Sequence, residues 1–146
     1  MAYTTIDDPS AHFHVQLYTG TGSTQSVGND GNSNLKPDWV WIKKRNSSGN
    51  NSVFDSSRGA TKEIITNGGN AEATDAQLLT QFDTDGFTVG TNSGVNGSSD
   101  TFVAFQWKAN GGTTSSNSDG NSTTTVQANT TAGFSIVLGS FTGSTP

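Results

Sequence analysis

The sequence of 146 residues contains no cysteine, so it forms neither a disulfide framework nor a thiolate metal site. Charged residues make up only 13% of the chain, with a net charge of −5, and its run of like charge is short, covering residues 43–45. This distribution argues against a nucleic-acid-binding surface. No apolar run approaches the roughly 18 residues that span a bilayer, so we expect no membrane insertion. The first residues lack the basic and apolar regions of a signal peptide. If the protein acts outside a cell, we therefore expect release by assembly or lysis rather than classical secretion.

Hydrophobic residues are also scarce, at 29% of the chain, and such a composition alone would permit disorder. They are, however, gathered into short runs that alternate with polar residues and end at Gly, Asn, Asp or Ser. Alternation with a period of two is typical of strands, and the bounding residues are typical of turns. Roughly seven to nine short strands at close spacing predict an all-β protein, an antiparallel two-sheet sandwich.

The densest apolar run covers residues 37–45 and contains two of the three tryptophans. In a strand, successive side chains point to opposite faces, so Trp39 and Trp41 share one face while Val40 and Ile42 share the other. Both faces are apolar, which predicts a strand covered on both sides. Residues 101–108 have the same character and are the expected partner of this strand at the centre of a sheet.

The remaining elements are predicted from alternation and turn signals. Residues 11–18 form a strand in which Phe13, Val15 and Leu17 share one face, opposite a face that carries the two histidines. Residues 46–51 connect a hairpin, residues 59–66 form a strand that ends at an Asn-Gly turn, and residues 78–90 form a second hairpin. A short helix is expected near residues 71–79, where Thr74 and Gln77 have the spacing of a capping box.

Changes in composition and hydrophobic pattern along the chain predict four segments: an arm at 1–10, a sandwich at 11–109, a polar linker at 110–122 and a strand segment at 123–146. Residues 132–145 partly repeat residues 11–24, since both open Ala-x-Phe and close on Gly-Ser-Thr. The second copy is interpreted as the first strand of an incomplete further domain, with chance similarity as the alternative. A strand without a domain of its own is expected to pair with a sheet edge of its own sandwich or of a neighbouring subunit. Its contact residues would be Phe134, Ile136, Leu138 and Phe141.

Phrases along nearly the whole chain resemble a family of proteins from tailed phages of marine bacteria. They are YTTIDDPSA (3–11), LYTG (17–20), NDGN (29–32), PDWVWIK (37–43), FDSSRG (54–59), AEATD (71–75), FDTDGF (82–87), VAFQWKANGG (103–112) and VQANTTAGF (126–134). The resemblance implies a concanavalin-A-like, jelly-roll sandwich and a setting on the virion surface. It implies no ligand. Relatives have further sandwich domains after the linker, whereas this sequence stops at Pro146, one strand into the second.

Enzymatic activity is not expected from this sequence. Glycosidases, which concanavalin-A-like folds also carry, need two carboxylates about 5–9 Å apart across the scissile bond. The two glutamates, Glu63 and Glu72, do not lie in an alternating acidic strand pattern, and neither a serine elbow nor a catalytic triad is indicated. We therefore predict no catalytic residues and no cofactor.

Several residues are weak candidates for binding, each with a structural alternative that we favour. His12 and His14 share one strand face and are candidates for a metal or a pH sensor, against a polar sheet face or subunit contact. Asp83 and Asp85 resemble the start of a calcium loop, against a hairpin turn; Asp30, Asn32 and Asn34 pose the same alternative. Arg58 is expected in a structural ion pair. The three tryptophans are candidates for a sugar-stacking platform, against core packing: Trp39, Trp41 and Trp107.

These observations favour a non-enzymatic structural protein of the phage particle, either capsid decoration or part of a fibre, acting by protein–protein docking and forming a homo-oligomer. The arm and the C-terminal tail would serve as clasps. The alternative is a carbohydrate-binding adhesin that recognises glycans on the host surface.

Overall fold

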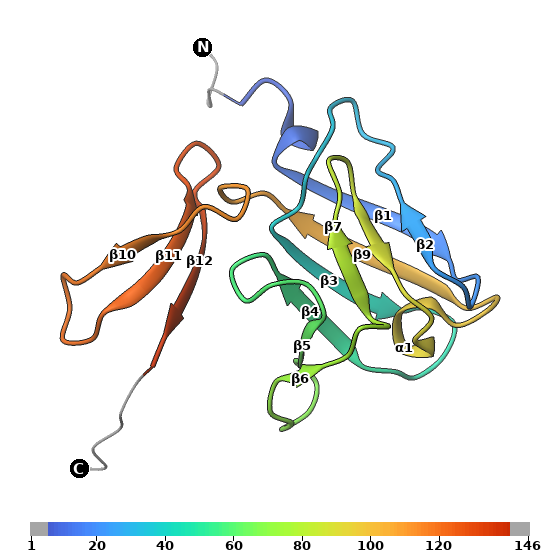
Figure 1. Cartoon of the computed structure of the whole chain (residues 1–146). Coiled ribbons are helices and arrows are strands. Elements are labelled where there is room, and N and C mark those ends of the chain that lie inside the picture. Colours follow the sequence, from blue (N-terminus) through green and yellow to red (C-terminus); the bar gives the residue numbers. More distant parts are fainter. Residues whose placement is uncertain (1–5, 141–146) are drawn as a thin grey trace.

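The computed structural model describes residues 6–140 as a mostly β protein built from three open antiparallel sheets (Figure 1). The largest sheet has six strands in the order β1-β9-β3-β4-β5-β6. Its strands are β1 (Phe13–Thr19), β9 (Thr101–Trp107), β3 (Trp39–Lys44), β4 (Asn51–Asp55), β5 (Lys62–Ile65) and β6 (Ala73–Thr74). The 3-10 helix η1 (Pro9–Ala11) precedes β1, within and just after the predicted arm.

Two further sheets have three strands each. One has the order β2-β8-β7, with β2 (Gln25–Val27), β8 (Phe87–Val89) and β7 (Leu79–Phe82), and the helix α1 (Ser93–Asn96) follows β8. The other, which we call the C-terminal sheet, has the order β10-β11-β12, with β10 (Ser115–Asn117), β11 (Thr124–Asn129) and β12 (Phe134–Gly139). Among the described residues, no helix is long and apolar enough to cross a membrane.

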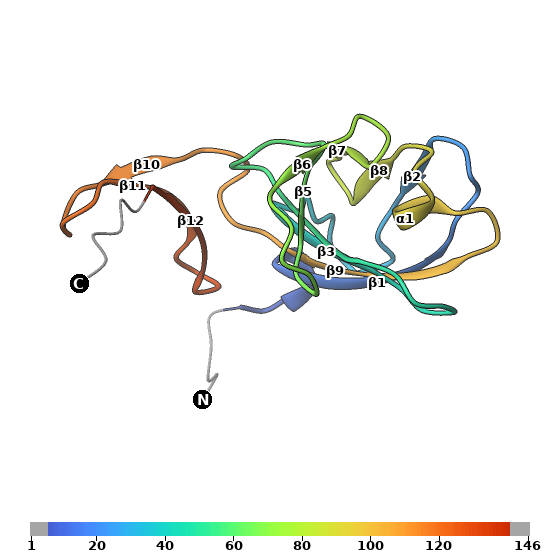
Figure 2. The ribbon, with the colours of Figure 1, turned by 90° about the horizontal axis from the view of Figure 1, so that it is seen from below.

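The hydrophobic core lies between the six-stranded sheet and the β2-β8-β7 sheet, which form two layers in Figure 2. Side chains from both layers are fully buried there, including Phe54 and Phe102 from one and Phe87 from the other. Chains this poor in hydrophobic residues can bury a core only if the few they have converge on one space. The C-terminal sheet stands beside these two layers and contributes nothing to this core cluster.

The predicted central pair is confirmed, because β3 pairs with β9 along its whole length. Val40 and Ile42 are buried in the core, as expected for one face of β3. The expectation that both faces are covered is wrong: Trp39 and Trp41 point away from the core and stay partly exposed. A strand buried on both faces requires a layer on each side, and the second layer of this sandwich covers only one face.

The apolar face of β1 is also turned outward. Phe13, Val15 and Leu17 share one face as predicted, but their exposures are 38%, 39% and 53%. The opposite face of β1 points inward, where Tyr18 packs against the core and its hydroxyl donates a hydrogen bond to Val95 O at 2.6 Å. Burial raises the pKa of the Tyr18 hydroxyl far above its usual range. The apolar row of β1 therefore faces away from the core.

The helix expected at residues 71–79 is wrong. That segment contains the short strand β6, which pairs with β5, then a turn, and then the start of β7. The backbone N–H of Gln77 donates to Asp75 Oδ1 at 2.8 Å, so the capping pattern belongs to a side-chain turn. Both hairpins are confirmed: β3 and β4 flank residues 46–50, and β7 pairs with β8.

The strand-like runs at residues 123–128 and 133–141 form β11 and β12, but the C-terminal segment holds a small sheet of its own rather than one extra strand. Strand β12 pairs with β11 rather than with an edge of its own sandwich, and β10 lies inside the segment expected to be a linker. All three side chains of β10 are exposed. Its polar residues carry no strand signal, because backbone pairing needs no apolar side chain. Of the predicted contact residues, Phe141 lies outside the described residues.

Candidate docking surface

The outer face is the side of the six-stranded sheet that points away from the core. Directly paired residues in antiparallel strands project their side chains to the same side. One row across the sheet joins Val15, Phe105, Trp41, Val53 and Ile64 through successive strand pairings. The neighbouring rows add apolar side chains on either side: Phe13, Trp107 and Trp39 in one, Leu17 and Val103 in the other.

The aromatic side chains of the outer face are in mutual contact. Trp107 is at the centre, with ring centroids 4.7 Å from Phe13 and 4.8 Å from Trp39. Trp41 packs edge-on to Trp39 at 6.3 Å and lies 5.6 Å from Phe105. Aromatic pairs of this geometry contribute about 0.5–1.5 kcal/mol each beyond the area that they bury, which holds the rings in this arrangement. The outer face is therefore a preformed aromatic surface.

The C-terminal sheet forms a wall at one end of this face. Phe134, at the start of β12, stacks on Trp107 with a centroid distance of 6.0 Å. Ile136 is buried and Leu138 is partly buried on the same side of β12, which faces the sandwich. Two open cavities of about 390 and 400 Å³ both include Phe134 in their lining. Their lining includes Ile6, His12, Phe13 and Trp107 in one, and Trp39, Val53, Arg58 and Ile64 in the other.

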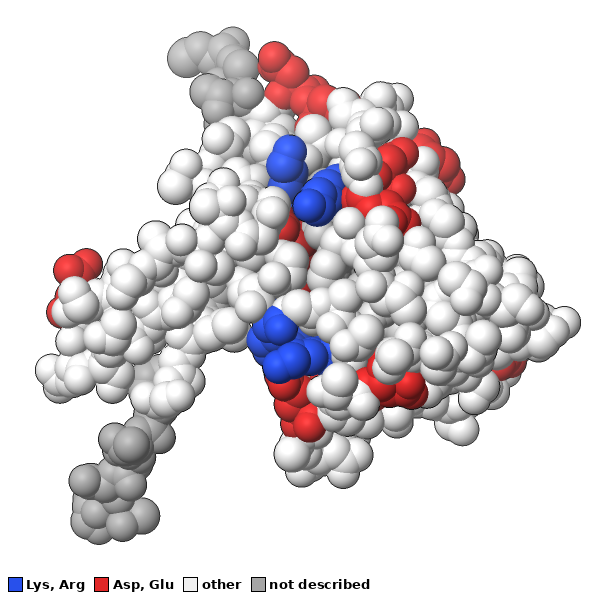
Figure 3. Space-filling model, viewed as in Figure 1, with Lys and Arg blue, Asp and Glu red and all other residues white. Residues whose placement is uncertain are grey.

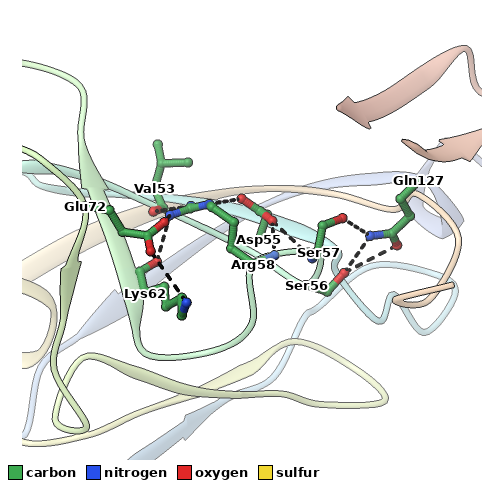
Figure 4. A network of polar contacts seen from close by, with 8 residues as sticks. All are labelled: Val53, Asp55, Ser56, Ser57, Arg58, Lys62, Glu72 and Gln127. Atoms are coloured by element: carbon green, nitrogen blue, oxygen red, sulfur yellow. Dashed lines mark hydrogen bonds and ion pairs between the residues drawn. The ribbon is translucent and has the colours of Figure 1, made fainter. Parts of the chain in front are cut away.

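A buried hydrogen-bond network attaches the C-terminal sheet to the sandwich. Gln127 of β11 is fully buried, and its amide nitrogen donates to the hydroxyls of Ser56 (3.0 Å) and Ser57 (2.7 Å). Its amide oxygen accepts from the backbone N–H groups of Asn110 and Gly112 at 3.1 and 2.8 Å. Figure 4 shows Gln127 reaching from β11 to the two serines. One side chain thus satisfies groups from two segments far apart in sequence.

Asp38 belongs to the same hydrogen-bond network, because it shares Ser56 with Gln127. It is fully buried, and its carboxylate accepts hydrogen bonds from Ser56 Oγ (2.6 Å) and from the backbone N–H groups of Ala109 (2.7 Å) and Gly111 (2.9 Å). A buried carboxylate is tolerated when such donors surround it. Through Asp38, the start of the predicted linker is fixed to the strand that carries the tryptophans.

We expect Gln127→Leu to loosen the C-terminal sheet without unfolding the sandwich. Leucine has a similar volume but removes the hydrogen bonds to two backbone N–H groups and two hydroxyls. Ser56 keeps Asp38 as its acceptor, and a buried group that stays unpaired costs about 1–3 kcal/mol. Hydrogen exchange should show faster exchange in β11 and β12 and unchanged protection in β3 and β9. Equal acceleration in all four strands would contradict this assignment.

Arg58 forms the predicted structural ion pair. Its guanidinium donates to Asp55 Oδ2 at 2.5 Å and to Glu72 Oε2 at 3.0 Å, and it also reaches the backbone carbonyls of Val53 and Lys62 (Figure 4). The hydrogen bond from Arg58 holds the pKa of the Glu72 carboxyl below its usual value. The network fixes the turn after β4 at the edge of the outer face.

The basic run at 43–45 is divided among different contacts. Lys44 Nζ donates to Asp100 Oδ2 at 2.7 Å, and Lys43 Nζ donates to Gly49 O at 3.0 Å. Figure 3 shows the face that carries the β2-β8-β7 sheet, where Lys and Arg lie in two small groups near acidic side chains. This face has no extended patch of basic charge, the kind of surface by which proteins bind nucleic acid.

The Lys44–Asp100 pair predicts a loss of stability in acid. The hydrogen bond from Lys44 holds the pKa of Asp100 below its usual value of 3.8 in the folded state. A group with a depressed folded pKa stabilises the fold above its unfolded pKa, and this contribution is lost as the pH falls through the folded pKa. The melting temperature of Asp100→Asn should therefore lie below that of the unsubstituted chain at neutral pH. The difference should shrink below pH 3.8; a constant difference would contradict it.

A family model described as a domain of unknown function, DUF7483, matches residues 8–146. The chain belongs to this family. No curated protein and no solved structure is significantly similar to it. The DUF7483 match covers the sandwich and the C-terminal sheet together. The family model therefore treats as one domain the two parts that Gln127 connects.

The weak candidates for metal binding lie apart in this DUF7483 chain. His12 Nδ1 is 3.0 Å from Asn129 Nδ2, whereas His14 Nε2 is 2.8 Å from Asp30 Oδ1. Asp83 accepts hydrogen bonds from Ser26 and Thr88, and Asp85 accepts one from the backbone N–H of Leu35, so both stabilise the β7–β8 hairpin. Among residues 6–140, no three His, Asp or Glu side chains are placed to share a metal ion.

Sequence reasoning missed the residues that join the DUF7483 chain into one unit. Gln127 and Asp38 carry no motif, and a single Gln in a polar segment is typical of an exposed position. A usable signal was the position of Gln127 in a strand between Val126 and Ala128. Its side chain must point to the face of the sheet opposite to these two apolar residues. The outward direction of the tryptophans had no sequence signal, since both faces of β3 are apolar.

Proposed function

We propose that this chain is a non-enzymatic structural protein of a phage particle surface, in capsid decoration or in a fibre, and that it docks on other virion proteins through the outer face. The observation that carries the proposal is the outward apolar row of β1, continuous with the aromatic cluster on β3 and β9. Large contiguous apolar patches on a soluble protein mark interaction sites. The sequence resemblance supplies the phage setting.

The composition of the outer face fits protein docking. Interface centres are enriched in tryptophan and phenylalanine and depleted of charge. On the outer face the three central rings are Trp39, Trp41 and Trp107. The charged residues beside them are Asp55, which lies opposite Trp39 and is paired with Arg58, and Lys43, which lies opposite Val103. Strand β12 rises from one end of the outer face, where Phe134 stacks on Trp107, so the surface is concave there and favours a partner of matching shape.

We also propose that the two-layer core belongs to the jelly-roll, concanavalin-A-like class. Two packed antiparallel sheets and non-sequential strand neighbours such as β1 and β9 support this proposal. An experimental structure compared with known sandwiches would test this. A strand order that matches another sandwich class would reject it.

The setting is tested by the protein content of purified particles. The chain should be present in intact virions, and antibody against it should label their surface. Many copies spread over the capsid would indicate decoration, and a few copies at the tail would indicate a fibre. Absence of the chain from purified particles would reject the virion assignment.

The alternative proposal is an adhesin that binds host glycans. The observation in its favour is that the tryptophans are partly exposed on the outer face rather than in the core, so their rings are accessible for stacking on a sugar. A glycan array read with and without calcium tests it, with Trp39→Ala as the variant that should lose any signal. An array with no hits would reject this alternative and leave protein docking unaffected.

A further inference from the structure

The six-stranded sheet has a free edge at β1, where a further strand could pair. Strand β1 stands at the end of this sheet and pairs with β9 on one side only. It has seven residues in continuous register, without a bulge, and its sequence FHVQLYT contains neither proline nor a charged residue. Natural edge strands are normally protected by lysine, proline, bulges, shortness or a covering loop or helix. None of the first four devices is present in β1, and the loop at residues 30–33 bonds to the side chains of Ser10, His14 and Gln16 rather than to the edge backbone.

The backbone groups that β1 directs away from β9 can be assigned. His12 O accepts from Lys108 N at 2.9 Å, and Gly20 N donates to Asp100 O at 2.8 Å. Hydrogen-bonded pairs alternate along an antiparallel ladder, so the even-numbered residues of β1 bond to β9. The odd-numbered residues, 13 to 19, direct their N–H and C=O groups to the free edge.

Side-chain contacts agree with this assignment. The carbonyl of Leu17 accepts from Gln16 Nε2 at 3.1 Å, and the carbonyl of Thr19 accepts from Gln25 Nε2 at 3.2 Å. These amides occupy two edge carbonyls in the single chain, and they can be displaced by the backbone N–H groups of an incoming strand.

We propose that the occupant of this edge is β1 of a second copy of the chain, paired antiparallel about a two-fold axis at Gln16. Only registers that place odd residues opposite odd residues can form hydrogen bonds, and the register centred on Gln16 is the one that uses the whole strand. Val15 then lies opposite Leu17 of the second copy, and Phe13 lies opposite Thr19. The strand brings no like charges together, as a self-complementary contact requires.

The pairing would bring the exposed side chains of Val15 and Leu17, at 39% and 53%, opposite each other. Cross-strand neighbours from the second copy would cover part of these side chains. It also joins two outer faces into one continuous surface. The partner of the edge is thus a second copy of the chain, and the dimer presents a larger docking surface. The purpose of this dimer rests on the proposed docking function.

The absence of cysteine allows the register to be tested by cross-linking. Gln16→Cys places two thiols opposite each other at a non-hydrogen-bonded pair, where Cα atoms are about 4.5 Å apart and a disulfide can form. We expect mild oxidation to give a covalent dimer that reductant reverses. The matched control is Thr19→Cys on the same strand, whose opposite residue is Phe13, and it should stay uncrosslinked. Equal cross-linking of both variants, or of neither, would overturn the register.

Association is tested by sedimentation of the full chain. We expect twice the chain mass of 15.1 kDa for the unsubstituted protein and a single chain mass for Leu17→Pro. Proline there removes an N–H that faces the edge and spares the ladder to β9; an unchanged thermal melt would show that the variant folds. A monomeric unsubstituted chain, or a folded Leu17→Pro dimer, would overturn the inference. Particle binding by a monomeric chain would leave the docking proposal intact while overturning this one.

Discussion

Replacing Phe54 by alanine is expected to lower the free energy of unfolding by about 3–5 kcal/mol, the largest stability loss that we predict for a single substitution. Phe54 is fully buried on the inner face of β4 and packs in the core between the two layers. A domain of this size is stable by only about 5–15 kcal/mol. The loss would therefore leave the protein marginal at physiological temperature. Urea unfolding followed by tryptophan fluorescence measures it.

Phe13→Ala is the matched control on the outer face. Phe13 is 38% exposed and its main aromatic contact is Trp107, so its replacement should cost about 1 kcal/mol. The contrast between the two phenylalanines tests on which side of the six-stranded sheet the core lies. Similar losses at both positions would contradict the two-layer arrangement.

Introducing a charge into the outer face should abolish docking while sparing the fold. Val15 lies in the central row of that face and is 39% exposed, so Val15→Lys can keep its ammonium group in water in the free chain. In a docked state the group would be desolvated without a partner. Substitutions at such positions weaken binding by about 2 kcal/mol or more, about thirty-fold. Co-sedimentation with particles lacking the chain measures the effect.

Val137→Lys is the control for this variant. Val137 is an exposed valine on β12, with 53% exposure, and it lies on the side of the strand opposite Phe134, Ile136 and Leu138. The same chemical change there should leave particle binding unchanged. If both variants bind as tightly as the unsubstituted chain, the outer face is not the docking surface.

Local patterns in the sequence predicted most strands and both hairpins, because alternation and turn residues act over a few neighbours. They predicted correctly that Phe13, Val15 and Leu17 share a face and that β3 pairs with β9. Local patterns could not predict which face of each strand packs against the core. Which side is covered depends on where the second layer packs, and that layer comes from residues far along the chain.

The attachment of the C-terminal sheet and its polar strand β10 were missed for a related reason. The attachment depends on Gln127, Asp38 and two serines, which meet only in the folded chain. The polar strand β10 has no signal of its own, and it is identified only by its pairing with β11. The helix predicted near Thr74 failed because a capping pattern in a short polar segment fits a side-chain turn equally well. The placement of Phe134, Ile136 and Leu138 in a subunit contact stays a prediction. Within the chain Ile136 is buried and the other two are partly covered.

The central claim is that the outer face is the surface by which the chain attaches to a virion. A cryo-EM reconstruction of the intact particle tests it most directly. We expect density for the chain at the particle surface, with Trp39, Trp41 and Trp107 against a neighbouring virion protein and the β2-β8-β7 sheet toward solvent. A reconstruction in which the chain is bound with its outer face open to solvent would contradict the claim.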